Sequence, residues 1–245
     1  MSNSLGTESS DPIGSETLGN IGEAGGFNKW MYSAISPYLQ GKILEIGSGL
    51  GNISGFLLED KQNVTLSDLR PEYCNYLSEH FKESKSLDRV VRIDIAGKDF
   101  DTAYGHLLGT FDSLFALNVI EHIEDDSKAL QNCKKLLKEQ GSIIILVPSY
   151  QWLYCSFDRE LGHFRRYSRQ SLKNLAKVSG FEVNNLFSFN AAGLGGWFLF
   201  GKLLNNRQIK EGQMKLFDNF VFLFRFIDTI LFHKSGLSLI LIARK

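Results

Sequence analysis

The sequence predicts an α/β domain built on a seven-stranded, mostly parallel sheet with helices on both faces. Along the 245-residue chain, short apolar runs alternate with segments of helical spacing. Proline or serine stands where several helices should begin, and glycine stands where they should end. The chain is also long enough for one large α/β domain with a sizeable core.

Seven runs are predicted to form strands because they are continuously apolar or alternate apolar with polar residues. They cover residues 42–47, 63–68, 89–94, 111–117, 142–148, 181–189 and 236–245. Since helical segments separate most of these runs, a parallel sheet is expected rather than a set of hairpins.

The helices are predicted from their spacing and from their start and stop residues. They cover residues 29–39, about 52–59, 71–84, about 125–139, and 168–181. Pro71 suits the first turn of its helix, and Ser168 suits the start of another. Gly141 and Gly180 are expected to stop the two helices that precede them.

Residues 190–234 interrupt the alternation and are predicted to form a helical insertion, two helices long, before the last strand. Its part 214–234 is rich in Phe, Leu and Ile, and Lys215, Asp218, Arg225 and Asp228 fall near one helical face. A helix this apolar should bury most of its surface. Its partner would be the rest of the domain, a second copy of the chain in a homodimer, or a lipid-like ligand or membrane surface.

Composition excludes some partners and compartments. The 27 basic and 27 acidic residues balance, so no overall field attracts nucleic acid or an anionic membrane. The three scattered cysteines indicate reduced thiols in a cytoplasmic protein, and no Cys/His spacing suggests a metal. Residues 1–26 lack the pattern of a signal peptide and are expected to form a flexible N-terminal arm. No apolar run is long enough to predict a transmembrane helix.

The stretch "ILEIGSGLGN", residues 43–52, is a glycine-rich turn after the first strand. It lacks the lysine of a P-loop, and Asn52 replaces the last glycine of the dinucleotide fingerprint. Instead, Glu45 precedes three alternate glycines. Glycine lets the backbone adopt positive φ and approach a ligand closely. An acid at this point favours a cationic amino group and disfavours a pyrophosphate.

Two further acids stand at the ends of the next strands. Asp68 can accept both hydroxyls of a ribose, and Asp94 can accept from the exocyclic amine of adenine. An adenosine that carries a cationic amino-acid tail is S-adenosylmethionine. The alternative for Asp68 and Asp94 is a structural role as helix caps.

With these residues the sequence resembles the class I S-adenosylmethionine-dependent methyltransferases, over roughly residues 27–245. "FALNVIEHIEDD" (115–126) and "GSIIILVPSY" (141–150) resemble the family segments of the fourth and fifth strands. The resemblance implies a Rossmann-like fold with S-adenosylmethionine as cofactor. The cofactor-binding residues it implies are Glu45, Gly47, Gly49, Gly51, Asp68, Leu69, Asp94, Ile95, Leu117 and Asn118.

The segment "ELGHFRRYS", residues 160–168, is the predicted acceptor edge of the site. His163 can serve as a base at neutral pH, and Tyr167 can donate or stack. Arg165 and Arg166 offer forked donors to an anionic acceptor group. Alternatively, the arginines pair with nearby acids, such as Asp158 and Glu160, and fix the loop.

Other candidates lie closer to the cofactor. His122 is a second candidate base, or else it shapes the cofactor pocket, and the same alternatives hold for Glu121. Trp30 and Tyr32, on the helix before the first strand, either contact the cofactor or pack in the core. Methyl transfer itself requires no metal, so no metal is expected.

The predicted function is methyl transfer from S-adenosylmethionine to a small-molecule or lipid-like acceptor. One alternative is a macromolecule methyltransferase, although zero net charge and the absence of a basic tract argue against nucleic acid. A second alternative is a non-catalytic protein that only binds S-adenosylmethionine. A dehydrogenase is poorly supported because Asn52 breaks its fingerprint.

Overall fold

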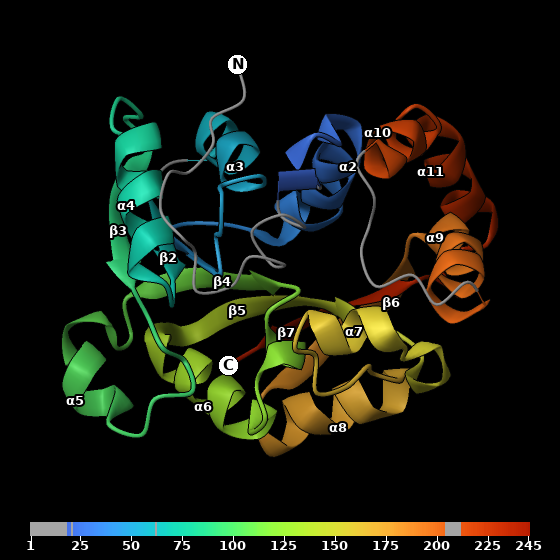
Figure 1. The fold of residues 1–245 in the computed structure, drawn as a ribbon. Helices are drawn as coiled ribbons and strands as arrows, with labels where there is room; N and C mark the ends of the chain where they lie inside the picture. The colour runs from blue at the N-terminus through green and yellow to red at the C-terminus, as the bar shows by residue number, and fades with distance from the viewer. Residues whose placement is uncertain (1–18, 21, 62, 204–211) are drawn as a thin grey trace.

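The computed structural model describes residues 19–20, 22–61, 63–203 and 212–245, and its centre is a seven-stranded sheet (Figure 1). The strands are β1 (Ile43–Ile46), β2 (Val64–Asp68), β3 (Leu87–Arg92), β4 (Phe111–Leu117), β5 (Leu137–Pro148), β6 (Glu182–Phe189) and β7 (Ser238–Arg244). Their order across the sheet is β3-β2-β1-β4-β5-β7-β6. Only β7 runs antiparallel to its neighbours, β5 and β6. The predicted fold class is confirmed.

Helices cover both faces of the sheet. The α-helices are α2 (Gly25–Ile35), α3 (Ser54–Asp60), α4 (Pro71–His80), α5 (Phe100–Tyr104), α6 (Asp126–Leu136), α7 (Ser156–Glu160), α8 (Arg169–Val178), α9 (Ala191–Gly196), α10 (Gln213–Asp218) and α11 (Val221–Ile230). Short 3₁₀ turns lie at η1 (Ser36–Tyr38), η2 (Gly105–Leu107), η3 (Ile120–His122) and η4 (Gln151–Leu153), and η5 (Trp197–Leu203) is a π-helix. Figure 1 shows α2, α3 and α4 on one side of the sheet and α5, α6 and α8 on the other.

The core has two parts because neighbouring residues of a strand point to opposite faces. Ile43 of β1 packs with α2, α3 and α4, whereas Leu44 packs with α5, α6 and α8. Both side chains are buried, and full burial of such a side chain stabilises the fold by about 1.5–3 kcal/mol. This two-sided burial explains why the central strands are mostly apolar instead of alternating with polar residues.

Several predicted boundaries are wrong. The helix expected to reach residue 139 ends at Leu136, because Gly109 N and Thr110 N bind the carbonyls of Lys135 and Leu136. Strand β5 therefore begins at Leu137, before Gly141. The helix expected over 71–84 ends at His80, and β3 ends at Arg92, so Asp94 lies two residues beyond the strand.

Most of the predicted N-terminal arm, 1–18 and 21, lies outside the described residues, whereas Gly25 and Gly26 already belong to α2. No helix within the described ranges is long and apolar enough to cross a membrane.

The insertion forms three α-helices and a π-helix among its described residues instead of the two helices expected. Residues 214–234 do not form one continuous helix, since α10 ends at Asp218 and α11 begins at Val221. The acids of this segment point inward. Asp218 accepts from Gly26 N (3.0 Å) and Phe27 N (2.6 Å) at the start of α2, and Asp228 accepts from Asn190 N and Ala191 N (both 2.7 Å).

With its acids bound to backbone N–H groups, the segment leaves much of its apolar surface exposed, so packing against the rest of the domain does not cover it. We call this the insertion surface. It comprises Leu216, Phe220, Phe222, Leu223, Phe226, Ile230, Leu231 and Phe232, which are 42–78% exposed. Figure 1 places α10 and α11 beside α2, at the margin of the molecule.

Candidate active site

The glycine turn after β1 has the backbone that the sequence predicts. Gly47, Gly49 and Gly51 all have positive φ, at 75°, 53° and 80°. Gly47 N and Ser48 N donate to Ser67 O at 2.8 and 2.9 Å, which fixes the turn to β2. A Cβ on Gly47 would lie 2.5 Å from Val119 Cγ2, so only glycine fits between this turn and the segment after β4.

Glu45 lies beneath the turn and is almost fully buried. Ser54 Oγ donates to its carboxylate at 2.6 Å. Burial raises the pKa of Glu45 from 4.5 to about 7, and the negative charge of Asp68 adds to this rise. A cation bound beside the carboxylate would lower the pKa of Glu45 again, because it favours the ionised form.

Asp68, at the end of β2, holds the turn from the other side. Its carboxylate accepts from Gly49 N at 3.0 Å and from Arg70 N at 2.9 Å. Burial raises the pKa of Asp68, while these backbone hydrogen bonds oppose the rise. The adjacent Leu69 is half exposed. Asp68 therefore orders the glycine turn, and its role as the ribose acid stays a prediction.

The remaining predicted cofactor residues lie at the same edge of the sheet. Asp94 is half-buried and accepts from Ala96 N at 2.9 Å, while the buried Ile95 accepts from Asn132 through its carbonyl. Asn118 follows Leu117 at the end of β4 with φ of 54° and donates to Leu146 O at 2.9 Å. Trp30 and Tyr32, on α2, are buried in the core, and Tyr32 donates to Asp60 at 2.6 Å.

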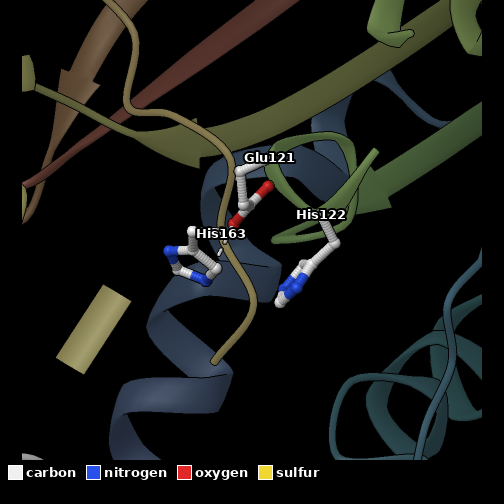
Figure 2. A group of neighbouring side chains, drawn as sticks. All are labelled: Glu121, His122 and His163. Carbon is white, nitrogen blue, oxygen red and sulfur yellow. Dashed lines mark ion pairs between the residues drawn. The ribbon is translucent and has the colours of Figure 1, made fainter. Parts of the chain in front are cut away.

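The structure brings the two candidate histidines together. The rings of His122 and His163 meet edge to face, with centroids 4.5 Å apart. Glu121 Oε1 lies 4.0 Å from His163 Nε2 (Figure 2). Phe164 N donates to Glu121 O at 2.8 Å, which joins the loop after α7 to the segment after β4. The two segments therefore form one site, although about forty residues separate them in the sequence.

Asp158 orients His163. Its Oδ1 lies 3.0 Å from His163 Nδ1 and also accepts from Arg166 Nε at 2.8 Å. Although burial opposes it, the hydrogen bond from His163 and the charge of Arg166 lower the pKa of Asp158. The ionised carboxylate accepts a hydrogen bond from Nδ1, which places Nε2 on the side of Glu121.

The arginines and the tyrosine of the loop have internal partners. Arg166 is buried, donates to Ser149 O at 3.2 Å, and lies 4.4 Å from the Trp197 ring. Arg165 pairs with Asp126 at 2.8 Å and donates to Glu124 O. Tyr167 is buried and donates to Asp126 at 2.8 Å; burial raises its pKa. Of the two alternatives for the arginines, pairing with a nearby acid is found for Arg166, whose partner is Asp158. Binding of an acceptor by either arginine stays a prediction.

Sequence reasoning missed two contributors to this edge. Trp197 of the insertion covers Arg166, and Val119 fills the space beside Gly47. Neither has a motif of its own. Val119 lies next to Asn118, and this adjacency was the only sequence signal.

Comparison with known proteins finds a methyltransferase domain in this chain. Residues 44–143 match the model of a methyltransferase domain. The match supports a class I S-adenosylmethionine-dependent methyltransferase. The matched range contains the glycine turn, Asp68, Asp94 and His122, and it ends within the segment 141–150 that also carried the sequence resemblance.

Individual relatives of the methyltransferase are distant. The ubiquinone biosynthesis O-methyltransferase of Xanthomonas axonopodis pv. citri (strain 306) is 26% identical over 104 residues, which are 42% of this chain and 41% of that protein. The chain therefore spans less than half the length of this curated relative.

Solved structures agree with the fold. A SAM-dependent methyltransferase from Archaeoglobus fulgidus matches with a TM-score of 0.57 at 16% identity, covering 89% of this chain and 94% of that one. Phosphoethanolamine N-methyltransferase 2 of Haemonchus contortus, solved with S-adenosyl-L-methionine, matches with a TM-score of 0.57 at 18% identity, covering 88% and 52%.

The buried Glu45 predicts how the stability of the methyltransferase depends on pH. Its pKa is higher in the folded chain than in the unfolded chain, so folding binds a proton. Stability is therefore lost as pH rises from about 4.5 through 7. Glu45→Gln should match the wild type in stability near pH 4 and exceed it at pH 8 by up to about 3 kcal/mol.

Urea unfolding of the ligand-free chain at both pH values measures this difference. Glu59→Gln is the matched control, because Glu59 is exposed on α3 and should show no such pH dependence. An equal stability difference between Glu45→Gln and the wild type at both pH values would contradict the prediction.

Proposed function

We propose that this chain transfers the methyl group of S-adenosylmethionine to a small, lipid-like acceptor. The observation that carries the proposal is the contact that joins the glycine turn to the segment beside the two histidines. Val119 packs against Gly47 of the glycine turn, and two residues later Glu121 lies 4.0 Å from His163. A methyl donor held by the glycine turn would thus face the two histidines.

The proposed reaction is an in-line displacement. A lone pair on the acceptor attacks the methyl carbon, the carbon–sulfur bond breaks, and its electron pair stays on sulfur as S-adenosylhomocysteine. The acceptor loses a proton if its nucleophile is a hydroxyl. His163 Nε2 can take that proton, because Asp158 holds the opposite nitrogen of the ring at 3.0 Å. The site residues otherwise orient the acceptor and exclude water.

The proposed cofactor residues are those at the carboxyl edge of β1 to β4. Glu45 supplies a carboxylate for the cationic tail, and the turn at Gly47, Gly49 and Gly51 offers backbone without Cβ atoms. Asp68 has one oxygen bound to Gly49 N and one bound to Arg70 N. Since a carboxylate oxygen accepts more than one hydrogen bond, both can still take ribose hydroxyls.

Asp68→Ala is expected to weaken S-adenosylmethionine by about 1.5–3 kcal/mol, the scale of a charge-assisted hydrogen bond. Titration calorimetry measures the loss. Asp68→Asn separates the two roles of the residue, since it keeps an acceptor for Gly49 N but loses the charge. An unchanged dissociation constant for Asp68→Ala would leave Asp68 with only its role in the turn.

The insertion surface supports a lipid-like acceptor. Trp197, at the start of η5, covers Arg166 beside the histidines, so the insertion adjoins the acceptor edge. The charges of the insertion also favour a lipid-like acceptor. In 212–234 the exposed charged residues are the basic Lys215, Arg225 and Lys234. The acids Asp218 and Asp228 are bound to backbone N–H groups. An amphiphile with an anionic head would meet both apolar and basic groups.

Phe222→Ser with Phe226→Ser should raise the KM for a lipid-like acceptor roughly tenfold or more, because binding would no longer bury two rings. Val178→Ser, at an exposed apolar position on α8, is the matched control. A homodimer through the same surface is the alternative. In that case the double variant would lower the sedimentation coefficient and leave the acceptor KM unchanged.

The proposed function is tested by incubating the chain with methyl-labelled S-adenosylmethionine and fractionated cell extract. Label should enter the organic-solvent fraction. Label confined to protein or RNA would support the macromolecule alternative, and no transfer despite cofactor binding would support the non-catalytic one. A thermal-shift comparison of S-adenosylmethionine with NAD, in which only the former should stabilise the chain, checks the cofactor separately.

A further inference from the structure

Glu121, His122 and His163 form a group with the composition and spacing of a metal site. Each offers one ligand atom, and these atoms all lie within 4.8 Å of one another. Figure 2 shows the three side chains gathered where the segment after β4 meets the loop after α7. One carboxylate and two imidazoles are a donor set that binds Zn²⁺ and other divalent transition ions.

The carboxylate of Glu121 is the second observation that points to a cation ligand. The side chain is fully buried, and neither oxygen has a hydrogen-bond partner among the described residues. Buried polar groups are almost always hydrogen-bonded, and a buried charge needs a partner or a metal. His163 Nε2, at 4.0 Å from Oε1, is too far for a hydrogen bond and lies about 0.5 Å beyond the separation of two tetrahedral ligands of one ion.

The surroundings of His163 have the arrangement found behind metal-bound histidines. Asp158 lies 3.0 Å from Nδ1 and is itself held by Arg166, which fixes the ring and leaves Nε2 as the ligand atom. A carboxylate on the far nitrogen of a ligating histidine is a recurrent outer-shell feature of metal sites. His122 is exposed, so the open side of the group faces solvent and could admit water or an acceptor oxygen.

We propose that Glu121, His122 and His163 bind one divalent transition-metal ion of the Zn²⁺ type. Metal–ligand bonds of 2.0–2.2 Å put tetrahedral ligand atoms about 3.3–3.6 Å apart, so ligand atoms that lie within 4.8 Å of one another must approach by up to about 1.5 Å. The 4.0 Å between Glu121 Oε1 and His163 Nε2 must also shorten when the ion binds. The site revises the sequence expectation that no metal is bound, and it does not depend on the identity of the methyl acceptor.

The site is tested on the full chain after removal of metal by a chelator, without S-adenosylmethionine. Titration with Co²⁺ should show one equivalent bound, with the visible absorption of a low-symmetry site, and Zn²⁺ should displace it. Glu121→Gln and His122→Ala should each weaken Co²⁺ by more than about 100-fold, since loss of an outer-shell partner alone costs 10–100-fold. Asp158→Asn should fall within that smaller range.

His106→Ala is the matched control, because His106 is exposed on η2, away from the group. It should bind Co²⁺ as the wild type does. His122→Ala keeps the test decisive if Glu121→Gln fails to fold, since loss of an exposed side chain should not unfold the chain. Wild-type affinity in His122→Ala, no stoichiometric binding to the wild type, or binding of Mg²⁺ in place of Co²⁺ and Zn²⁺ would each overturn the proposal.

Discussion

Gly49→Val should reduce the binding of S-adenosylmethionine and of S-adenosylhomocysteine below detection. Gly49 has φ of 53°, a conformation that a β-branched residue adopts only with strain. Its N–H also donates to Asp68 at 3.0 Å, so a shift of this residue displaces the proposed ribose acid. The valine side chain would in addition occupy the space along which the cofactor is expected to lie. Titration calorimetry with both ligands measures the loss.

Gly109→Val separates backbone strain from loss of the site. Gly109 has φ of 64° in the loop before β4, and a Cβ there would meet nothing within 4 Å. This control should lower the melting temperature but keep the wild-type affinity for S-adenosylmethionine. Tight binding of S-adenosylmethionine by Gly49→Val, or tight binding of NAD by the wild type, would show that the turn does not hold this cofactor.

The glycine turn was predictable because its chemistry is local. Three alternate glycines can only be explained by positive φ or by close approach, and both occur, since Gly47 has φ of 75° and no room for a Cβ beside Val119. The strands were predictable for the same reason: residues 43–46 and 111–117 are mostly apolar because each strand is covered on both sides.

The acceptor edge was only partly predictable, because its residues meet through tertiary contacts. His122 and His163 were separate candidates in the sequence, and tertiary contacts such as the hydrogen bond from Phe164 N to Glu121 O bring them to one place. The buried state of Glu121 has no sequence signal, since an acid beside a histidine is usually solvated.

The insertion, too, was only partly predictable, because acids that the sequence places on a solvated face bind backbone groups instead. A helical projection puts the charged residues on one face, and a charged face is expected to meet water. Asp218 and Asp228 instead bind the backbone N–H groups that begin α2 and α9. These helix starts need an acceptor, and no property of residues 214–234 alone reveals that need.

His163→Ala should lower the rate of methyl transfer by about 10²–10⁴-fold, the usual contribution of a general base, with cofactor affinity nearly unchanged. Rate and cofactor affinity are expected to respond separately because the residues concerned lie in different places. The glycine turn follows β1 and Asp68 ends β2, whereas His163 is held by Asp158 and lies beside Glu121. Single-turnover rates measure the chemical step, and calorimetry with S-adenosylhomocysteine measures cofactor affinity.

Two origins of this rate loss can be separated. If His163 acts as the base, a chelator leaves the wild-type rate unchanged. If it acts as a metal ligand, the chelator reproduces the defect in the wild type, and added Zn²⁺ restores the wild type but not His163→Ala. Asp158→Asn should share the defect in part, because Asp158 only orients the ring. A His163→Ala chain that loses the cofactor would place the loop in the cofactor site. Normal turnover by this variant would leave His163 a structural role and move the candidate base to His122, whose ring lies 4.5 Å away.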